Sequence, residues 1–255
     1  MVTRCNLAEL VSYANKLMDI AAFDDYAPNG LQLEGAAAVT KVVSGVTASL
    51  ALIEAAIEAE ADVLLVHHGY FWRGEDSCIT GIKKRRIKKL LENDISLLAY
   101  HLPLDAHPLY GNNAQLAKIL GLVRKPTPEG ASLPAWVSCG ELSRSMLAHE
   151  FSQHLETILG RTPLYLPGGD EKITRIAWCT GGAQSYFEQL AKLGFDAYLS
   201  GEVSEQTTHI AREYGVHYFA AGHHATERYG VQALAEHLKS HFEIEHQFID
   251  IENPV

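Results

Sequence analysis

The chain has 255 residues, of which 47% are hydrophobic and 20% charged. These fractions are typical of a globular protein and exclude a disordered or collagen-like chain. Its 31 acidic residues outnumber its 21 basic ones, which gives a formal net charge of −10. Because that charge repels phosphate backbones, we expect no general nucleic-acid-binding surface, although a small anionic substrate could still bind where positive charge is concentrated.

The cysteines and the apolar runs indicate a cytoplasmic protein without a membrane span. The four cysteines lie far apart and form no CxxC pair, so the sequence indicates neither a disulfide framework nor a thiolate zinc site. No apolar run approaches the roughly 18 residues that cross a bilayer. The first residues have amphipathic-helix spacing rather than the apolar core of a signal peptide.

The first predicted element is a helix near the N-terminus. Apolar residues recur at helical spacing from Leu7 to Met18, and Asn6 together with Glu9 is predicted to cap the helix. The following Pro28-Asn29-Gly30 is a turn signal, so this segment is predicted to be a loop that enters the first sheet.

A β-α-β-α-β pattern follows from Lys41. An apolar strand, an Ala-rich helix and a second apolar strand lead to His67 and His68. A basic helix is predicted over residues 82–93. The next strand ends at His101, and Asp105 follows four residues later.

The back half repeats this pattern from Arg175. Asp196 takes the position that Asp62 has in the first unit, and the last strand ends near His223, with Glu227 four residues later. We interpret the chain as a divergent internal duplication of an α/β unit with mostly parallel sheets. The predicted organisation is a first lobe over residues 1–121, a variable insert over 122–172, and a second lobe over 173–255 that completes a metal site between the lobes.

Histidines and carboxylates stand at the predicted strand ends, where sites form in parallel α/β sheets. Imidazole and carboxylate ligands together suit zinc, iron or manganese. Adjacent strand residues point to opposite faces, so a histidine doublet serves one site only if the strand ends there; the alternative is an exposed doublet without a role. Five or six ligands exceed what one catalytic zinc uses, so two divalent ions are predicted. The predicted ligands are His67, His68, Asp105, His223 and Glu227.

The remaining histidines divide into three groups. His101 is a candidate for metal ligation or for proton transfer, and His224 and His107 are candidates for orienting ligands or moving protons. His217 lies inside an apolar strand and is expected in the core. Glu202 occupies the place in the second repeat that His68 holds in the first, which makes it a candidate for supporting a ligand. Solvent-exposed positions are expected for the others discussed, His154, His237, His241 and His246.

The basic run KKRRIKK, at residues 83–89, contains six cations in an otherwise acidic chain. Its helix carries Ile87, Leu90 and Leu91 as an apolar face, so the run is either a solvated outer face or a surface that guides an anionic substrate. The Gly181-Gly182 pair after a strand resembles a phosphate-binding turn, although a bare GG is a weak signal.

Four segments, DYAPNGLQLEG, ADVLLVHHGYFWRG, HLPLDAHP and GHHATERYG, resemble the bacterial YbgI family of dinuclear-metal-centre proteins, also called type 2 GTP cyclohydrolase I homologues. The resemblance covers nearly the whole chain. It implies two interlinked α/β lobes and assembly as a ring-shaped homohexamer. It also implies that the five predicted ligands hold two divalent ions.

The functional hypothesis is a two-metal hydrolase that acts on a purine nucleotide, with GTP converted to dihydroneopterin triphosphate and formate. His101 and His224 are the candidates for proton transfer. The alternatives are a metal-dependent phosphoesterase, a hydrolase of damaged nucleotides, and a non-catalytic metal-binding scaffold or regulator.

Overall fold

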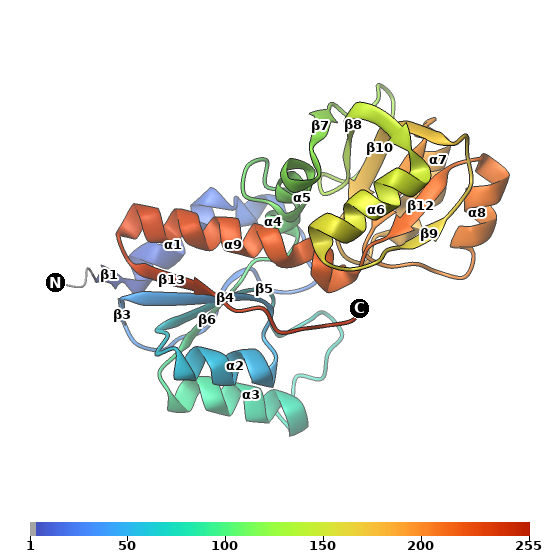
Figure 1. Cartoon of the computed structure of the whole chain (residues 1–255). Coiled ribbons are helices and arrows are strands. Elements are labelled where there is room, and N and C mark those ends of the chain that lie inside the picture. Colours follow the sequence, from blue (N-terminus) through green and yellow to red (C-terminus); the bar gives the residue numbers. More distant parts are fainter. Residues whose placement is uncertain (1–3) are drawn as a thin grey trace. The chain divides into compact units, whose positions relative to one another are not determined.

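The computed structural model describes residues 4–255, which divide into two compact units (Figure 1). One unit contains the chain up to Gly111 together with Gly230–Glu252, and the other contains Asn112–Tyr229 with Asn253–Val255. The α/β class predicted from the sequence is confirmed. Within the described residues, none of the helices combines the length and the apolar character needed to cross a bilayer.

The first unit is built on a five-stranded sheet in the order β13-β4-β5-β6-β2, in which β2 runs antiparallel to its neighbour and the other strands are parallel. Strands β1 and β3 form a small two-stranded antiparallel sheet in the same unit. The strands are β1 (Cys5–Asn6), β2 (Gly30–Leu33), β3 (Ala38–Val39), β4 (Lys41–Thr47), β5 (Val63–His68), β6 (Ser96–Ala99) and β13 (Glu245–Phe248). The helices are α1 (Leu7–Leu17), the 3-10 turn η1 (Ile20–Ala22), α2 (Leu50–Glu58), α3 (Gly81–Glu92), α4 (Leu102–Ala106) and the later part of α9 (His223–Phe242).

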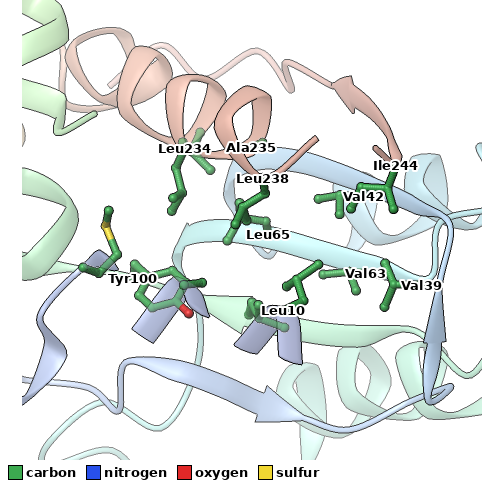
Figure 2. Close-up of a cluster of buried hydrophobic side chains, with 14 of the residues drawn as sticks. Leu10, Val39, Val42, Val63, Leu65, Tyr100, Leu234, Ala235, Leu238 and Ile244 are labelled. Atoms are coloured by element: carbon green, nitrogen blue, oxygen red, sulfur yellow. The ribbon is translucent and has the colours of Figure 1, made fainter. Parts of the chain in front are cut away.

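Both faces of this sheet are covered by helices, because alternate residues of each buried strand face opposite sides. On one face Val63 and Leu65 of β5 contact the apolar sides of α1 and α9, where Leu234 and Leu238 point toward the sheet (Figure 2). On the other face Leu64 packs among residues of α2 and α3. This burial on two faces explains the continuous apolar run before the histidine doublet.

The second unit is built on a six-stranded sheet in the order β7-β8-β10-β11-β12-β9, whose central strands β10, β11 and β12 are parallel. The strands are β7 (Leu122–Lys125), β8 (Ser138–Leu147), β9 (Leu164–Leu166), β10 (Lys172–Cys179), β11 (Ala197–Ser200) and β12 (His217–Ala220). The helices are α5 (Asn112–Leu120), α6 (Ala148–Leu159), η2 (Gln184–Tyr186), α7 (Phe187–Ala191), α8 (Thr207–Tyr214) and the first turns of α9. One core cluster joins the sheet to α5 and α6, and another joins it to α7 and α8.

The unit bounds differ from the predicted lobes, because residues 112–121 of the predicted first lobe belong to the second unit. Two further differences concern the predicted insert and helix α9. The segment 122–172, predicted as a variable insert, supplies β7, β8 and β9 to the second sheet. Helix α9 begins in the second unit, and its residues from Gly230 onward belong to the first. Both differences arise from long-range pairing, which the local sequence pattern does not contain.

The parallel cores of the two units share one local feature that follows from the sequence repeat. The Asp62 carboxylate accepts hydrogen bonds from the backbone amides of Thr40 and Lys41, at 2.6 and 3.0 Å. The Asp196 carboxylate accepts from the amides of Thr174 and Arg175, at 2.8 and 2.7 Å. Each aspartate therefore binds the neighbouring strand directly before the two strands begin their parallel pairing, while the duplication itself stays a prediction.

Candidate metal centre

The histidine doublet lies at the end of β5, as the sequence predicts. His67 is fully buried and His68 is half-buried, and their ring centroids are 4.4 Å apart. The strand ends at His68. Gly69 comes next, and a side chain at this position would collide with the side chain of Gln32. The chain therefore turns directly after the doublet, which lets two adjacent residues take part in one group of ligands.

His101 joins this pair from the end of the neighbouring strand β6. Its ring centroid lies 5.2 Å from that of His67 and 5.8 Å from that of His68. Potential ligand nitrogens of all three rings lie within 4.8 Å of one another. The three histidines of the first unit therefore form one group that could hold a divalent ion.

Asp105 reaches the same group from the short helix α4, which begins directly after His101. The amide of Asp105 donates to the carbonyl of His101 at 3.1 Å, so the spacing of four closes one helical turn. The Asp105 side chain is 9% exposed, and its Oδ1 lies 3.5 Å from Nε2 of His67. A buried carboxylate facing an imidazole nitrogen at this distance is a pair that could bind one cation.

Each histidine of this group is held through its Nδ1 nitrogen. Nδ1 of His67 lies 2.9 Å from the carbonyl oxygen of Tyr100, and Nδ1 of His68 lies 3.2 Å from Oγ1 of Thr47. Nδ1 of His101 lies 2.7 Å from Oδ1 of Asp25. Protein partners on Nδ1 fix the ring orientation and make Nε2 the ligand nitrogen, which is the usual arrangement around protein-bound metals.

Asp25 is a candidate functional residue that the sequence patterns did not identify. Burial raises the pKa of its carboxyl, but the hydrogen bonds with His101 and Asn29 outweigh that effect and lower the pKa to about 2. The carboxylate also accepts from the amide of Leu102, at 2.9 Å. Asp25 therefore stays ionised at neutral pH and fixes both the ring of His101 and the start of α4. Its only signal in the sequence was a place in the DDYAPNG loop.

The second unit, described by itself, carries a group of side chains at the first turn of α9. Nε2 of His223 lies 3.2 Å from Oε2 of Glu227, and Nδ1 lies 2.7 Å from Oε1 of Glu202. The spacing of four again sets a nitrogen and an oxygen on one turn of helix. Glu202, which the sequence suggested only by its place in the repeat, engages Nδ1 of His223 and leaves Nε2 on the side of Glu227.

The His223 ring has two carboxylates beside it, and they control its charge. Burial lowers its pKa, but the hydrogen bonds and charges of Glu227 and Glu202 outweigh burial and raise the pKa to about 9. The metal-free imidazole is therefore protonated at neutral pH. A divalent ion that binds at Nε2 would have to displace this proton, as metals generally do at histidine ligands.

Two glycines make room for this second group. A side chain at Gly181, whose φ is +66°, would collide with Oε1 of Glu227, and a side chain at Gly201 would lie 2.7 Å from Cα of His223. Gly181 therefore permits a close approach of the buried Glu227 carboxylate. This packing explains Gly181, while the phosphate-binding turn suggested by the Gly181-Gly182 pair stays a prediction.

The other predicted histidines have different environments. His224 is buried, and its backbone amide donates to the carbonyl of Val255 at 3.0 Å. Nδ1 of His107 accepts from the amides of Leu109 and Tyr110, which gives it a local role after α4. His217 is a core residue of β12, as expected.

The expected exposure is wrong for His246 and holds only in part for His237 and His154, which are half-buried. The His246 side chain is only 3% exposed, because β13 pairs with β4 and brings the ring against Ser44 and Glu236. His237 lies between the hydroxyls of Tyr13 and Tyr110, at 2.7 and 2.9 Å from its two ring nitrogens. Both environments depend on packing between segments that are more than a hundred residues apart in the chain.

The donor chemistry of both groups fits divalent metal ions. The first unit supplies His67, His68, His101 and Asp105, and the second supplies His223 and Glu227. All are imidazole nitrogens or carboxylate oxygens, without thiolate, which suits zinc, iron or manganese rather than soft metals. Their histidines are oriented through Nδ1, as ligands require. Each unit, taken by itself, therefore brings together those predicted ligands that lie in its own part of the chain.

Known proteins resemble the chain over almost its entire length. A protein of Pseudomonas aeruginosa named "GTP cyclohydrolase 1 type 2 homolog" is 57% identical over 248 residues, which cover 97% of this chain and 98% of that protein. An Escherichia coli protein of the same name is 51% identical over 247 residues, covering 96% and 98% of the two chains.

Solved structures share the fold. A structure described as "protein ybgI, unknown function" superposes with a TM-score of 0.94 at 49% identity, covering 98% of this chain and all of the other. A protein from Thermus thermophilus superposes with a TM-score of 0.88 at 35% identity, again covering 98% of this chain and all of the other. The model of the Duf34/NIF3 (NGG1p interacting factor 3) family matches residues 5–254, and the chain therefore belongs to this family.

Proposed function

We propose that the protein is a two-metal hydrolase whose substrate is a purine nucleotide. The nucleotide that we propose is GTP. The observation that carries the proposal is the shared orientation of four histidines, each with Nδ1 engaged by the protein: His67, His68, His101 and His223. Fixed imidazoles beside buried carboxylates are arranged as metal ligands are, and a structural role alone does not require four of them.

The proposed ligands of the two ions are His67, His68 and Asp105 from the first unit and His223 and Glu227 from the second. Bound divalent ions would lower the pKa of water and polarise the bond that is attacked. A carboxylate has two oxygens and can contact two cations, whereas one imidazole nitrogen cannot, so we assign the bridging role to Glu227. Its side chain is only 3% exposed, which limits competition from solvent.

His101 is the residue that we favour for proton transfer. Asp25 holds its Nδ1, so Nε2 is the atom that would accept and return a proton. Its side chain is 18% exposed, which gives a substrate access to the ring. His101 could instead serve as a further metal ligand, and His224 is the second candidate for proton transfer.

The substrate class is supported by the names of the curated relatives, "GTP cyclohydrolase 1 type 2 homolog". In the proposed reaction water attacks C8 of guanine and the imidazole ring opens. A second water then hydrolyses the resulting formamide and releases C8 as formate. Rearrangement of the ribose and ring closure with loss of one water complete the reaction, so that GTP and one water yield dihydroneopterin triphosphate and formate. The His101 imidazole would move a proton between the attacking water and the guanine ring nitrogen.

Metal content tests the proposed ligands. His223→Ala is expected to lower the bound metal without unfolding the protein, because the side chain is 29% exposed at the start of α9 and is not part of a core layer. His209→Ala is the matched control, since His209 also pairs with a glutamate, Glu205, at 3.4 Å but lies 61% exposed on α8. Unchanged metal in His223→Ala would contradict the assignment.

Product analysis tests the reaction. The metal-loaded protein is incubated with GTP and with other purine nucleotides, and formate, phosphate and ammonia are measured separately. Formate from GTP supports the proposal. Phosphate without formate would indicate a phosphoesterase instead, and turnover of modified nucleotides alone would indicate a hydrolase of damaged nucleotides. Full metal loading without any turnover would leave a metal-binding scaffold or regulator.

We further propose that the protein assembles as a homohexameric ring in the cytoplasm, as the family resemblance implies. Light scattering on the purified protein would measure the mass of the particle, for which the chain mass of 28.0 kDa is the unit. A monomeric or dimeric particle at micromolar concentration would contradict the ring.

A further inference from the structure

Two aromatic side chains, Tyr26 and Trp72, stand against His101 in the first unit. The ring centroid of Trp72 lies 4.9 Å from that of His101 with an interplanar angle of 87°, and that of Tyr26 lies 6.4 Å away at 64°. Trp72 is also 6.0 Å from the ring of His68. Both aromatic rings therefore border the histidine group without supplying a ligand atom to it.

These rings are not buried as core aromatics are. Tyr26 is 55% exposed and Trp72 is half-buried, whereas the large aromatic residues of the two cores are almost fully inaccessible. An exposed aromatic ring beside a group of candidate metal ligands offers a planar apolar face to whatever binds there.

The loop that carries Trp72 is held in an unusual backbone conformation. Phe71 has φ of +65°, which is rare for a bulky residue and marks a site where the surroundings impose the conformation. The amide of Tyr70 donates to Oε1 of Gln32 at 2.7 Å, and Nε2 of Gln32 donates back to the carbonyl of Tyr70 at 3.1 Å. This pairing anchors the loop directly before the strained residue.

Further hydrogen bonds hold the segments that carry Trp72 and Tyr26 in place. The amide of Trp72 donates to Glu75 at 3.2 Å, and Glu75 in turn pairs with Lys83 at 3.2 Å. The amide of Arg73 donates to the carbonyl of Tyr26 at 2.6 Å. The segments that carry the two aromatic residues, which are 46 positions apart in the sequence, are thus joined by a main-chain hydrogen bond. Their positions are fixed before any ligand binds, which reduces the entropic cost of binding.

We infer that Tyr26 and Trp72 bind the purine base of the substrate by stacking. This inference rests on the proposed function, in which the reacting atom, C8, belongs to the base and not to the phosphates. The part of the substrate nearest His101 must then be a flat heteroaromatic ring. Aromatic side chains are the usual partners of such rings, because every base presents a π-face.

Binding measurements with truncated ligands separate base recognition from phosphate recognition. The metal-loaded protein is titrated with GTP, with guanosine, which lacks the phosphates, and with inorganic tripolyphosphate, which lacks the base. Trp72→Ala and Tyr26→Ala are expected to weaken GTP and guanosine binding about ten-fold. Affinity for tripolyphosphate and metal content should stay unchanged. Trp72→Phe and Tyr26→Phe keep an aromatic face and should retain most of the affinity.

Tyr214→Ala is the matched control. Tyr214 is a tyrosine of the second unit that is 43% exposed, and Nζ of Lys192 lies 5.8 Å from its ring centroid, much as the guanidinium of Arg73 lies 6.0 Å from that of Tyr26. Its loss should leave all three affinities unchanged.

Three outcomes would overturn the inference, and each has a different consequence for the proposed function. Unchanged GTP and guanosine affinity in both alanine variants would remove the stacking role and leave the proposed function intact. Equal losses for tripolyphosphate and guanosine, together with lower metal content, would make the two aromatics supports of the histidine group. Failure of the parent protein to bind GTP or guanosine would remove the purine substrate as well.

Discussion

The Asp25 carboxylate holds Nδ1 of His101 at 2.7 Å, although the two residues are separated by 76 positions in the chain. The contact is nearly inaccessible to solvent, since the Asp25 side chain is 3% exposed and that of His101 is 18% exposed. A buried charged partner of this kind fixes the tautomer and the orientation of an imidazole. Asp25 is therefore expected to matter for the histidine group without contacting a metal.

With His101 as the further metal ligand, Asp25→Asn is predicted to lower metal affinity by about 10- to 100-fold, the range found when a partner of a histidine ligand is removed. The amide keeps the size of the side chain but removes its charge, so the fold should persist. Metal titration measures the affinity, and circular dichroism checks that the fold persists. Asp24→Asn is the control, because Asp24 is the neighbouring residue but is 90% exposed and pairs with Arg73 at the surface. Equal metal affinity in the two variants would contradict the role of Asp25.

Glu227→Gln tests the proposed bridge. The substitution keeps the shape of the side chain but removes the charge that would neutralise two cations repelling each other at short range. We expect at most about one bound metal per chain and a loss of hydrolysis on the order of 10²-fold. Elemental analysis and a formate assay measure the two effects. Two retained ions with full activity would show that another group bridges them.

The cations of α3 test substrate guidance. Three of the six are paired, Lys83 with Glu75, Lys88 with Glu92 and Lys89 with Glu54. The double change Lys84→Gln and Arg85→Gln therefore alters the exposed charge and leaves these pairs in place.

Leu91, expected on the apolar face, is instead 50% exposed, whereas Ile87 and Leu90 are buried.

If α3 guides an anionic substrate, the double variant should keep its metal and capture GTP more slowly, by about two-fold or more at low salt. The difference should fade as salt is added, because screening shortens the range of the field. Measuring kcat/KM against ionic strength checks this. Arg212→Gln, on α8 of the second unit, is the control. Identical values and identical salt response in the variant and the parent would indicate a solvated outer face.

His246 predicts how stability depends on pH. Burial lowers its pKa below the ordinary value of 6.5, despite the opposing effect of the Glu236 hydrogen bond. The folded state therefore binds fewer protons than the unfolded chain once the pH falls below 6.5, and the free energy of unfolding must fall with it. The His246 hydrogen bond lowers the pKa of Glu236, so that this carboxylate adds a further loss below its ordinary value of 4.5.

We expect protonation of His246 to lower the thermal midpoint between pH 7 and pH 5, so that the change from pH 7 to pH 5 is less destabilising in His246→Gln than in the parent, whereas His223, with its raised pKa, contributes in the opposite direction in both proteins. The glutamine cannot be protonated but can still approach Ser44 and Glu236, which face the ring from β4 and α9. Lys239 adds a positive charge nearby that disfavours the protonated ring. Differential scanning calorimetry of the metal-free protein at both pH values measures the effect. A larger decrease in the variant than in the parent would be inconsistent with this assignment.

Local features of the fold could be predicted from the sequence because their causes are local. Asn6 accepts a hydrogen bond from the amide of Ala8 and caps α1, as the spacing predicted. The strand that ends at His68 and the helical turns that begin at His101 and His223 also follow from short patterns. Hydrophobic periodicity determines element type over a few residues, and a spacing of four places two side chains on one helical turn.

The tertiary structure decided what depends on distant segments. Asp25 could not be identified as the partner of His101, or Trp72 as its neighbour, because no spacing links a loop near residue 25 to strand ends beyond residue 67. The same applies to the buried position of His246 and to the division of α9 at Tyr229 between the units. Residue patterns thus determined which side chains are candidates for the chemistry. Only the folded chain determined which groups orient them, because hydrogen-bond geometry depends on backbone positions that long-range strand pairing sets.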